Sequence, residues 1–311
     1  MNTFKKIGLG LLGVGLSLCA SFVNKNAFAD DSGSALTVSP MTQKIILVPG
    51  ERYEGAIKIS NPNLAKSDTA FSLSTSPFST VGENYDVDLG TESTYTQMKD
   101  WISFSKNQAS VAPNETKIIP FYIDVPADAP AGGQYATILV TNNTDFSKDY
   151  GKNGNVSIAS VMQISSIIYA TVMGETKETG EIVDNKLPSI VFTAPLTGSF
   201  TTKNTGNVHM DSKTTLQVFP LFSNEEIYTN EEEPQENLTM PETTKFNTIS
   251  WGNTPTFGIF HVIQKVEFAG KISKIDKYIL ICPLWLLFVI VFGILLIIIW
   301  LTSKNKSRKK K

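Results

Sequence analysis

Apolar and polar residues alternate with a period of two along most of residues 35–270. The spacing of three and four residues that marks an amphipathic helix does not recur in this part of the chain. Residues that share one face of the alternating runs are Tyr53, Gly55, Ile57 and Ile59, then Phe71 and Leu73, then Ile119, Phe121, Ile123 and Val125. Because successive side chains of a strand point to opposite faces, these runs predict half-buried β-strands.

Proline and glycine separate the alternating runs. Pro49-Gly50 suits the two central positions of a tight turn, and further breaks occur at 61–63, 112–115 and 125–130. Short antiparallel strands at this spacing predict an Ig-like β-sandwich over residues 35–173.

Three details of this domain are also predicted. Pro120 indicates an edge position or a bulge, because proline donates no ladder hydrogen bond. Residues 156–172 are long for one strand, so Ser165-Ser166 predicts a bulge at which the buried face switches. Residues 141–155 lack apolar periodicity and predict a long hairpin loop.

The composition changes after residue 173. Residues 174–186 are charged and contain glycine, which indicates a linker between domains. Strand patterns resume at 189–193, 199–203, 214–219, 246–251 and 257–268, and an acidic segment with seven acids occupies 225–242. The pattern predicts a second, smaller Ig-like sandwich over 187–273.

The N-terminus has the pattern of a secretory signal peptide. Two lysines precede the apolar run 7–20, and Ala27-Phe28-Ala29 is a small-x-small cleavage signature. Residues 1–29 are therefore predicted to be a signal peptide, with Ala27 and Ala29 at the cleavage site and 30–34 as a linker. A retained N-terminal anchor is the alternative.

The C-terminus has the pattern of a membrane anchor. From Ile279 to Leu301 the chain carries no charge, and a helix of this length reaches roughly 34 Å, which is enough for a hydrocarbon core. Six bases and no acid follow in 302–311, which predicts a cytoplasmic tail. We expect a single-pass cell-membrane protein with one transmembrane helix over 279–301 and its other domains outside the cell.

Charge and rare residues exclude several function classes. Residues 30–277 hold all 29 acids and 18 of the 27 bases, a net charge of −11, which argues against nucleic-acid binding. Two cysteines and two histidines exclude zinc fingers and disulfide scaffolds, and we expect no metal and no cofactor. Neither His209 nor His261 lies near a serine motif, so no catalytic residue is predicted. Loop carboxylates, such as Asp86 with Asp88 or Glu231–Glu233, leave a wall-active hydrolase open as an alternative.

Aromatic residues near the strand ends are the candidate binding residues. Tyr85 and Tyr95 lie among polar residues in the connection 84–101, and Trp101 ends that connection. Tyr85 and Tyr95 suit a partner surface, whereas core packing is favoured for Trp101, which is kept as a third candidate. The connection 84–101 and the loop 141–155 are the predicted binding region.

Several short motifs occur along the chain in an order that is similar to the order found in a known family. They are Val38-Ser39-Pro40, Pro49-Gly50-Glu51, Ile57-Lys58-Ile59-Ser60-Asn61-Pro62, Trp101-Ile102, Val111-Ala112-Pro113-Asn114-Glu115, Phe121-Tyr122-Ile123-Asp124-Val125-Pro126 and Pro130-Ala131-Gly132-Gly133-Gln134-Tyr135-Ala136. With the signal, the span and the basic tail, this order resembles the WxL-interacting surface proteins of Gram-positive bacteria over nearly the whole chain. In the short, acidic second domain only Lys203-Asn204-Thr205-Gly206-Asn207-Val208 matches the family's pattern.

The resemblance implies two Ig-like domains before one membrane helix. It implies peptidoglycan binding for the first domain, and contacts with a WxL-type surface protein or host matrix for the second. We therefore expect a non-catalytic cell-surface binding protein. An extracytoplasmic assembly factor that adds a strand to its client is a further alternative, and it predicts a long uncovered edge strand.

Overall fold

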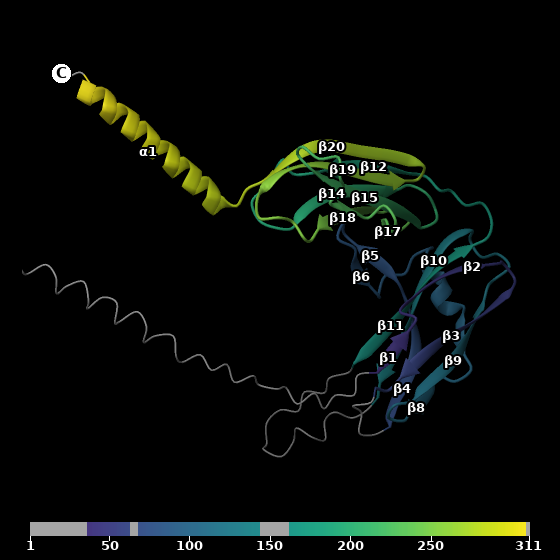
Figure 1. Ribbon diagram of the computed structural model, residues 1–311. Helices are drawn as coiled ribbons and strands as arrows, with labels where there is room; N and C mark the ends of the chain where they lie inside the picture. The colour runs from purple at the N-terminus through teal and green to yellow at the C-terminus, as the bar shows by residue number, and fades with distance from the viewer. Residues whose placement is uncertain (1–35, 63–67, 144–161, 309–311) are drawn as a thin grey trace, which may run out of the picture.

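The computed structural model describes residues 36–62, 68–143 and 162–308 of the 311-residue chain. Two β-sandwich domains follow one another, and the helix α1 (Leu284–Arg308) extends from the end of the second domain (Figure 1). The predicted all-β class is confirmed for both domains. The predicted signal peptide, with Ala27 and Ala29, lies outside the described residues.

Two sheets enclose the core of the first domain. One sheet has the strand order β1 (Thr37–Ser39), β3 (Arg52–Ser60), β9 (Thr116–Asp124) and β7 (Ile102–Phe104), and the other has the order β2 (Thr42–Leu47), β11 (Gln163–Val172), β10 (Gly132–Asn142), β4 (Thr69–Pro77) and β8 (Gln108–Val111). Within these two sheets, every pair is antiparallel except β2 with β11. A short 3-10 helix, η1 (Gln97–Asp100), precedes β7.

The alternation in the sequence predicts this core correctly. Ile57, Ile59, Phe121 and Ile123 are fully buried between the two sheets. Pro120 has β3 on one side only, because β7 pairs with β9 no further than Phe104 opposite Phe121. The edge prediction is therefore right at this position.

The bulge predicted at Ser165-Ser166 is wrong. The pairing of β10 with β11 runs without a shift from Gly132 opposite Val172 to Thr141 opposite Gln163. Ser166 is buried, and its hydroxyl donates a hydrogen bond to the carbonyl oxygen of Pro40 at 2.7 Å. The carbonyl group of Pro40 thus satisfies the buried Ser166 hydroxyl, and the same face of β11 points into the core along its whole length.

The second domain also has two facing sheets. One has the order β12 (Gly180–Lys186), β14 (Leu196–Asn204) and β18 (Thr244–Trp251), and the other has the order β13 (Ile190–Val191), β20 (Lys271–Ile281), β19 (Gly258–Phe268), β15 (Met210–Pro220) and β16 (Tyr228–Thr229), with β17 (Gln235–Thr239) also paired to β15. Leu216, Val218, Val262 and Ile279 are fully buried between the sheets.

The strands extend this domain beyond the predicted range 187–273. β12 lies in the predicted linker 174–186, where its charged residues occupy an edge strand and mask the strand signal. β20 continues to Ile281 after a tight turn at Ala269-Gly270, whose two residues both have positive φ, as a type I′ hairpin requires.

The helix after the second domain also starts later than the predicted transmembrane helix. Ile279 belongs to β20 and is fully buried in the second core, so it is not the start of a helix. Pro283 interrupts the strand, and α1 begins at Leu284 and includes Leu301. Over residues 36–62, 68–143 and 162–308, the structure contains no helix that combines the length and the apolarity of a membrane span.

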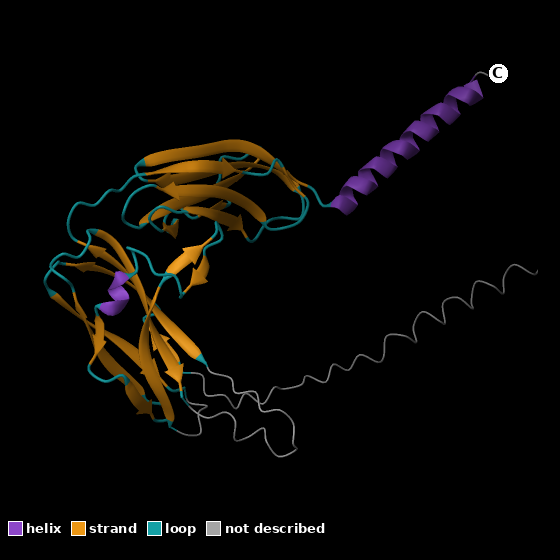
Figure 2. Ribbon diagram, turned by 180° about the vertical axis from the view of Figure 1, so that it is seen from behind, coloured by secondary structure: helices purple, strands orange, loops and turns teal. Residues whose placement is uncertain are grey.

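A small hairpin reaches from the first domain to the second. It consists of β5 (Ser79–Val81) and β6 (Asp86–Asp88), and both views show it between the two sandwiches (Figures 1 and 2). The backbone N–H of Phe246, in β18, donates a 2.9 Å hydrogen bond to the carbonyl oxygen of Glu83 in the turn of this hairpin. The hairpin therefore joins the two domains and positions the candidate site.

Candidate functional site

Glycines allow the two domains to approach closely at their junction. The N–H of Gly133 donates to the carbonyl oxygen of Asn207 at 2.7 Å, and the Asn207 amide donates to the carbonyl oxygen of Ala131 at 3.2 Å. A Cβ on Gly132, whose φ is +114°, would lie 2.4 Å from the Asn207 carbonyl oxygen. Only glycine fits there, because any side chain would separate the two backbones.

This junction brings together two of the segments that carry the family resemblance. Gly132 and Gly133 belong to the motif 130–136 of the first domain, and Asn207 belongs to the motif 203–208 of the second. Asn207 also accepts a hydrogen bond from the N–H of Lys177 at 2.6 Å. The two motifs therefore have a structural role at the junction, whatever else they do.

A buried aromatic cluster lies beside the glycines. Tyr135 is fully buried, and its hydroxyl is 3.2 Å from Nδ1 of His209 across the junction. The rings of Tyr135 and His209 both pack against Tyr169, at centroid distances of 5.8 Å. Burial lowers the pKa of His209 to about 4 and raises the pKa of Tyr169 to about 12, so both side chains are neutral at pH 7.

Tyr85 docks the hairpin onto the second domain. It occupies the turn with a φ of +60°, and its hydroxyl accepts a hydrogen bond from the N–H of Met240 at 2.9 Å and contacts the Thr243 hydroxyl. The Lys245 ammonium lies 4.7 Å from the centre of the ring. Burial raises the pKa of the Tyr85 hydroxyl. The side chain of Tyr85, one of the predicted binding residues, therefore forms part of the contact between the domains.

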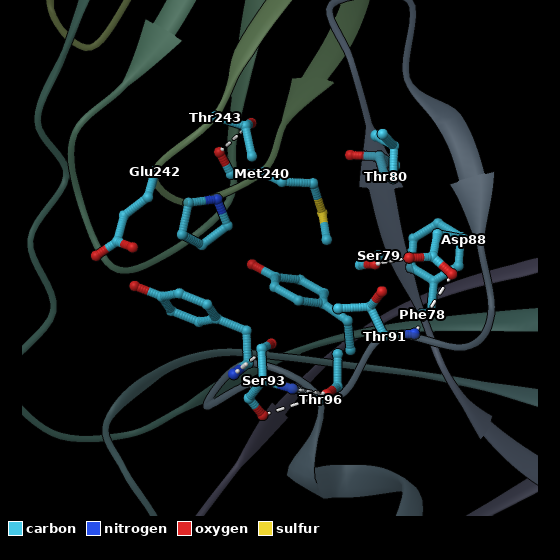
Figure 3. Close-up of a pocket in the computed structure, with 14 residues that line it drawn as sticks. Phe78, Ser79, Thr80, Asp88, Thr91, Ser93, Thr96, Met240, Glu242 and Thr243 are labelled. Atoms are coloured by element: carbon cyan, nitrogen blue, oxygen red, sulfur yellow. Dashed lines mark hydrogen bonds between the residues drawn. The ribbon is translucent and has the colours of Figure 1, made fainter.

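A cleft of about 310 Å³ opens next to this contact (Figure 3). Its first wall comes from residues 78–96 with Tyr135, and its second wall is the turn 240–243 of the second domain. Phe78, Tyr135 and Met240 are buried together and form its apolar part. Hydroxyl and carboxylate groups surround this apolar part, so the cleft presents both kinds of surface to a ligand.

The polar side chains of the cleft differ in how well they are paired. Asp88 accepts hydrogen bonds from Thr91 and Gly90, which hold its pKa below the usual range. Tyr95 lies partly buried near Glu242; burial first, and then this carboxylate, raise the pKa of its hydroxyl. The buried hydroxyl of Thr80 has no hydrogen-bond partner among the described residues, and it points toward the cavity (Figure 3).

The structure separates the three predicted binding residues. Tyr95 lines the cleft and Tyr85 holds its second wall in place, whereas Trp101 packs against the core of the first domain. Most of the predicted loop 141–155 lies outside the described residues. The turn 240–243 was missed, because nothing in its sequence indicates that it lies opposite residues 78–96.

The cleft combines apolar surface with polar side chains. A catalytic acid needs a raised pKa, and the pKa of Asp88 is shifted the other way. No group of three or more metal-ligating side chains occurs in the described part of the chain. The other histidine, His261, lies on the outer face of the second domain, where its Nε2 is 2.5 Å from Asp276. An apolar surface flanked by oriented polar groups is typical of a ligand pocket.

Comparison with known proteins identifies no family. No family model and no curated protein matches the chain. Among solved structures, the class 5 fimbrial chaperone CfaA is 13% identical, with a TM-score of 0.38, over 80% of this chain and 100% of its own. The complex of the Salmonella enterica pilin SafA with the chaperone SafB has a matching chain, 9% identical, with a TM-score of 0.37, over 78% and 95%. At these scores the likenesses say nothing about family or function.

Proposed function

We propose that this chain is a non-catalytic cell-surface protein that binds a sugar unit of the cell-wall glycan in the cleft between its two domains. The observation that carries the proposal is the cleft itself, in which the apolar side chains of Phe78 and Met240 lie beside the polar groups of Tyr95, Asp88 and Glu242. A ligand with both an apolar face and hydroxyl groups can contact both kinds of surface at once.

The composition of the cleft suits a carbohydrate. A sugar ring has an apolar face that packs on aromatic side chains, and its edge carries hydroxyls that bond to carboxylates and hydroxyls. A volume of about 310 Å³ is at the small end of ligand pockets, which favours one or two sugar units. Glu242, Asp88 and the net charge of −11 between residues 30 and 277 disfavour anionic wall polymers. Peptidoglycan, which the family resemblance implies, is therefore the leading ligand.

The proposed location of the protein at the cell surface is based on the sequence patterns at the two ends of the chain. The pattern of residues 1–29 supports export, and the charge-free run that ends at Leu301 before six bases supports a single membrane anchor. In this arrangement both sandwiches lie outside the cell, and residues 302–311 lie in the cytoplasm. The cleft then faces the wall.

The alternatives have less support. The carboxylates of a hydrolase need a raised pKa on one partner, which Asp88 lacks. Strand addition needs an open edge. β13 pairs with β20 only at Leu280 and Ile281, but the Asn185 side chain donates to the carbonyl oxygen of Ser273 on the remaining edge of β20. That edge carries Lys271, Lys274 and Lys277, and lysines on an edge strand discourage pairing with another chain.

The test is co-sedimentation of the full-length chain, in detergent, with insoluble peptidoglycan. Glu242→Gln keeps the shape of the side chain but removes its charge, and Tyr95→Ala removes an aromatic wall. We expect each change to weaken binding about tenfold, the effect of roughly 1.4 kcal/mol. Tyr122→Ala, in β9 and outside the cleft, is the matched control. The proposal is wrong if the wild type stays in the supernatant, or if all three variants bind as it does.

A further inference from the structure

One end of the second domain carries three exposed phenylalanines, each in a different loop. Phe192 follows β13, Phe222 follows β15 and Phe257 precedes β19, with exposed fractions of 43%, 96% and 67%. Single exposed apolar residues are common on protein surfaces, but three at the loop tips of one domain end require an explanation. We call these three residues the phenylalanine rim.

Hydrogen bonds tie the rim to the place where the chain leaves for α1. Cys282 donates its N–H to the carbonyl oxygen of Val191 at 2.9 Å, next to Phe192. The N–H of Leu196 donates to Oγ1 of Thr254 at 2.9 Å, which joins the loops that carry Phe192 and Phe257. Leu221 donates to the carbonyl oxygen of Ile259 at 3.1 Å, beside Phe222. The three loops and the exit to the helix therefore form one end of the sandwich.

The adjoining sheet face is apolar as well. Ile190 pairs with Leu280, and Leu280 pairs with Ile259, so the three side chains form a row across β13, β20 and β19. All three are more than a third exposed. The row lies at the same strand ends as the rim and enlarges its apolar surface.

The opposite end of the domain is different. Its turns contain Gly206, Asn207 and the hairpin residues Ala269-Gly270, and the exposed large apolar residues do not include any from these turns. That end forms the polar junction with the first domain. The phenylalanine rim thus lies at the end from which α1 extends, whereas Phe246, which is 42% exposed, lies in β18 towards the junction end.

We propose that the phenylalanine rim rests in the interfacial layer of the lipid bilayer and holds the second domain against the membrane. The inference rests on the proposed membrane anchor. Only Cys282 and Pro283 separate β20 from α1, and two residues span at most about 7 Å. If α1 enters the bilayer, the rim lies at the headgroup level, where aromatic side chains are favoured.

The contact is apolar and does not depend on charged lipids. Glu225 and Glu226 follow Phe222 in the same loop, so anionic headgroups do not attract it. Contact of the phenylalanine rim with the bilayer also fixes the orientation of the second domain relative to the membrane. β20 has 11 residues and reaches roughly 33 Å, so the junction end, with the cleft, is held about that far from the bilayer.

The experiment measures the depth of nitroxide labels on the full-length chain in phosphatidylcholine vesicles. In a background of Cys19→Ser and Cys282→Ser, single cysteines replace Phe222, Phe257, Lys271 or Phe292, and the collision rates of each label with oxygen and with a water-soluble nickel complex are compared. Lys271, at the far end of β20, is the matched control, and Phe292, within α1, reports on the anchor.

We expect the ratio of oxygen to nickel collisions to be several-fold higher at positions 222 and 257 than at 271, and highest at 292. Added phosphatidylglycerol should leave this order unchanged. A membrane-embedded label at 292 with water-exposed labels at 222 and 257 would overturn the rim proposal alone. Water exposure at 292 as well would overturn the anchor and the rim together. Labels at 222 and 257 that become immobilised only when envelope proteins are added would show a protein partner and also overturn the rim.

Discussion

The loops at the two ends of the second domain carry different kinds of side chain. At the junction end, the Asn207 amide donates a hydrogen bond to Ala131 of the first domain, and Nδ1 of His209 lies within hydrogen-bond distance of the Tyr135 hydroxyl. At the helix end, Phe192, Phe222 and Phe257 remain exposed in the part of the chain that the structure describes. The comparison shows that one sandwich can carry hydrogen-bonding groups at one end and exposed apolar side chains at the other.

The largest expected effect is at the junction. Tyr135→Ala removes a fully buried ring from the aromatic cluster and takes the hydroxyl partner away from His209. We expect the free energy of unfolding to fall by about 3–5 kcal/mol, as is usual for a buried aromatic residue. Urea denaturation of the full-length chain measures it. Tyr122→Ala, which shortens a partly exposed side chain in β9, should cost clearly less; equal losses would contradict the special role of the junction.

A smaller loss is expected from Asn207→Ala. The change removes the amide that bonds to Ala131 and the oxygen that accepts from Lys177, and it leaves these backbone groups without partners. The expected cost is about 1–3 kcal/mol, and hydrogen exchange should speed up on both sides of the junction. Asn253→Ala, at an exposed position near the helix end, is the control and should change neither quantity.

The junction should also weaken in acid. The pKa of folded His209 is about 4, below the usual 6.5, so the unfolded chain binds a proton first as the pH falls. Stability is therefore complete above about pH 6.5 and declines as the pH approaches 4, by on the order of 2 kcal/mol. Asp211 opposes the shift and Lys44 supports it, while Tyr135 and Tyr169 face the ring as neutral groups.

The measurement is the urea midpoint between pH 7 and pH 4 for the wild type and for His209→Gln. His261 is present in both proteins, so the difference between the two curves isolates His209. If the curves run parallel, protonation of His209 does not weaken the junction.

The smallest effect on stability is expected at the helix end. Phe222 is 96% exposed, so Phe222→Ser should change the free energy of unfolding by less than about 0.5 kcal/mol. Thermal unfolding in detergent measures this. A loss comparable to that of Asn207→Ala would mean that the phenylalanine rim packs against protein, and the contrast between the two ends would then be wrong.

The sequence indicated residues of one wall of the candidate site and none of the opposite wall. Tyr85 and Tyr95 stood out as aromatic residues in a polar connection, and both contribute to the cleft. The opposite wall, 240–243, lies about 150 residues away in the chain, and no local pattern links the two segments. Trp101 has the same signal as the tyrosines, yet it packs into the core, because only the three-dimensional packing decides which aromatic ring finds a buried place.

The sequence by itself determined many of the central strands of both cores, such as β3, β9, β15 and β19, because alternation with a period of two is a local consequence of backbone geometry. It missed β12 and β20, where charged and lysine-rich edges hide that period. Only the tertiary structure decided that Gly132 meets Asn207, that Tyr85 caps Met240, and that three separate phenylalanines gather at one end. These contacts join residues far apart in the chain, and their formation depends on how the sheets pack, which no local pattern encodes.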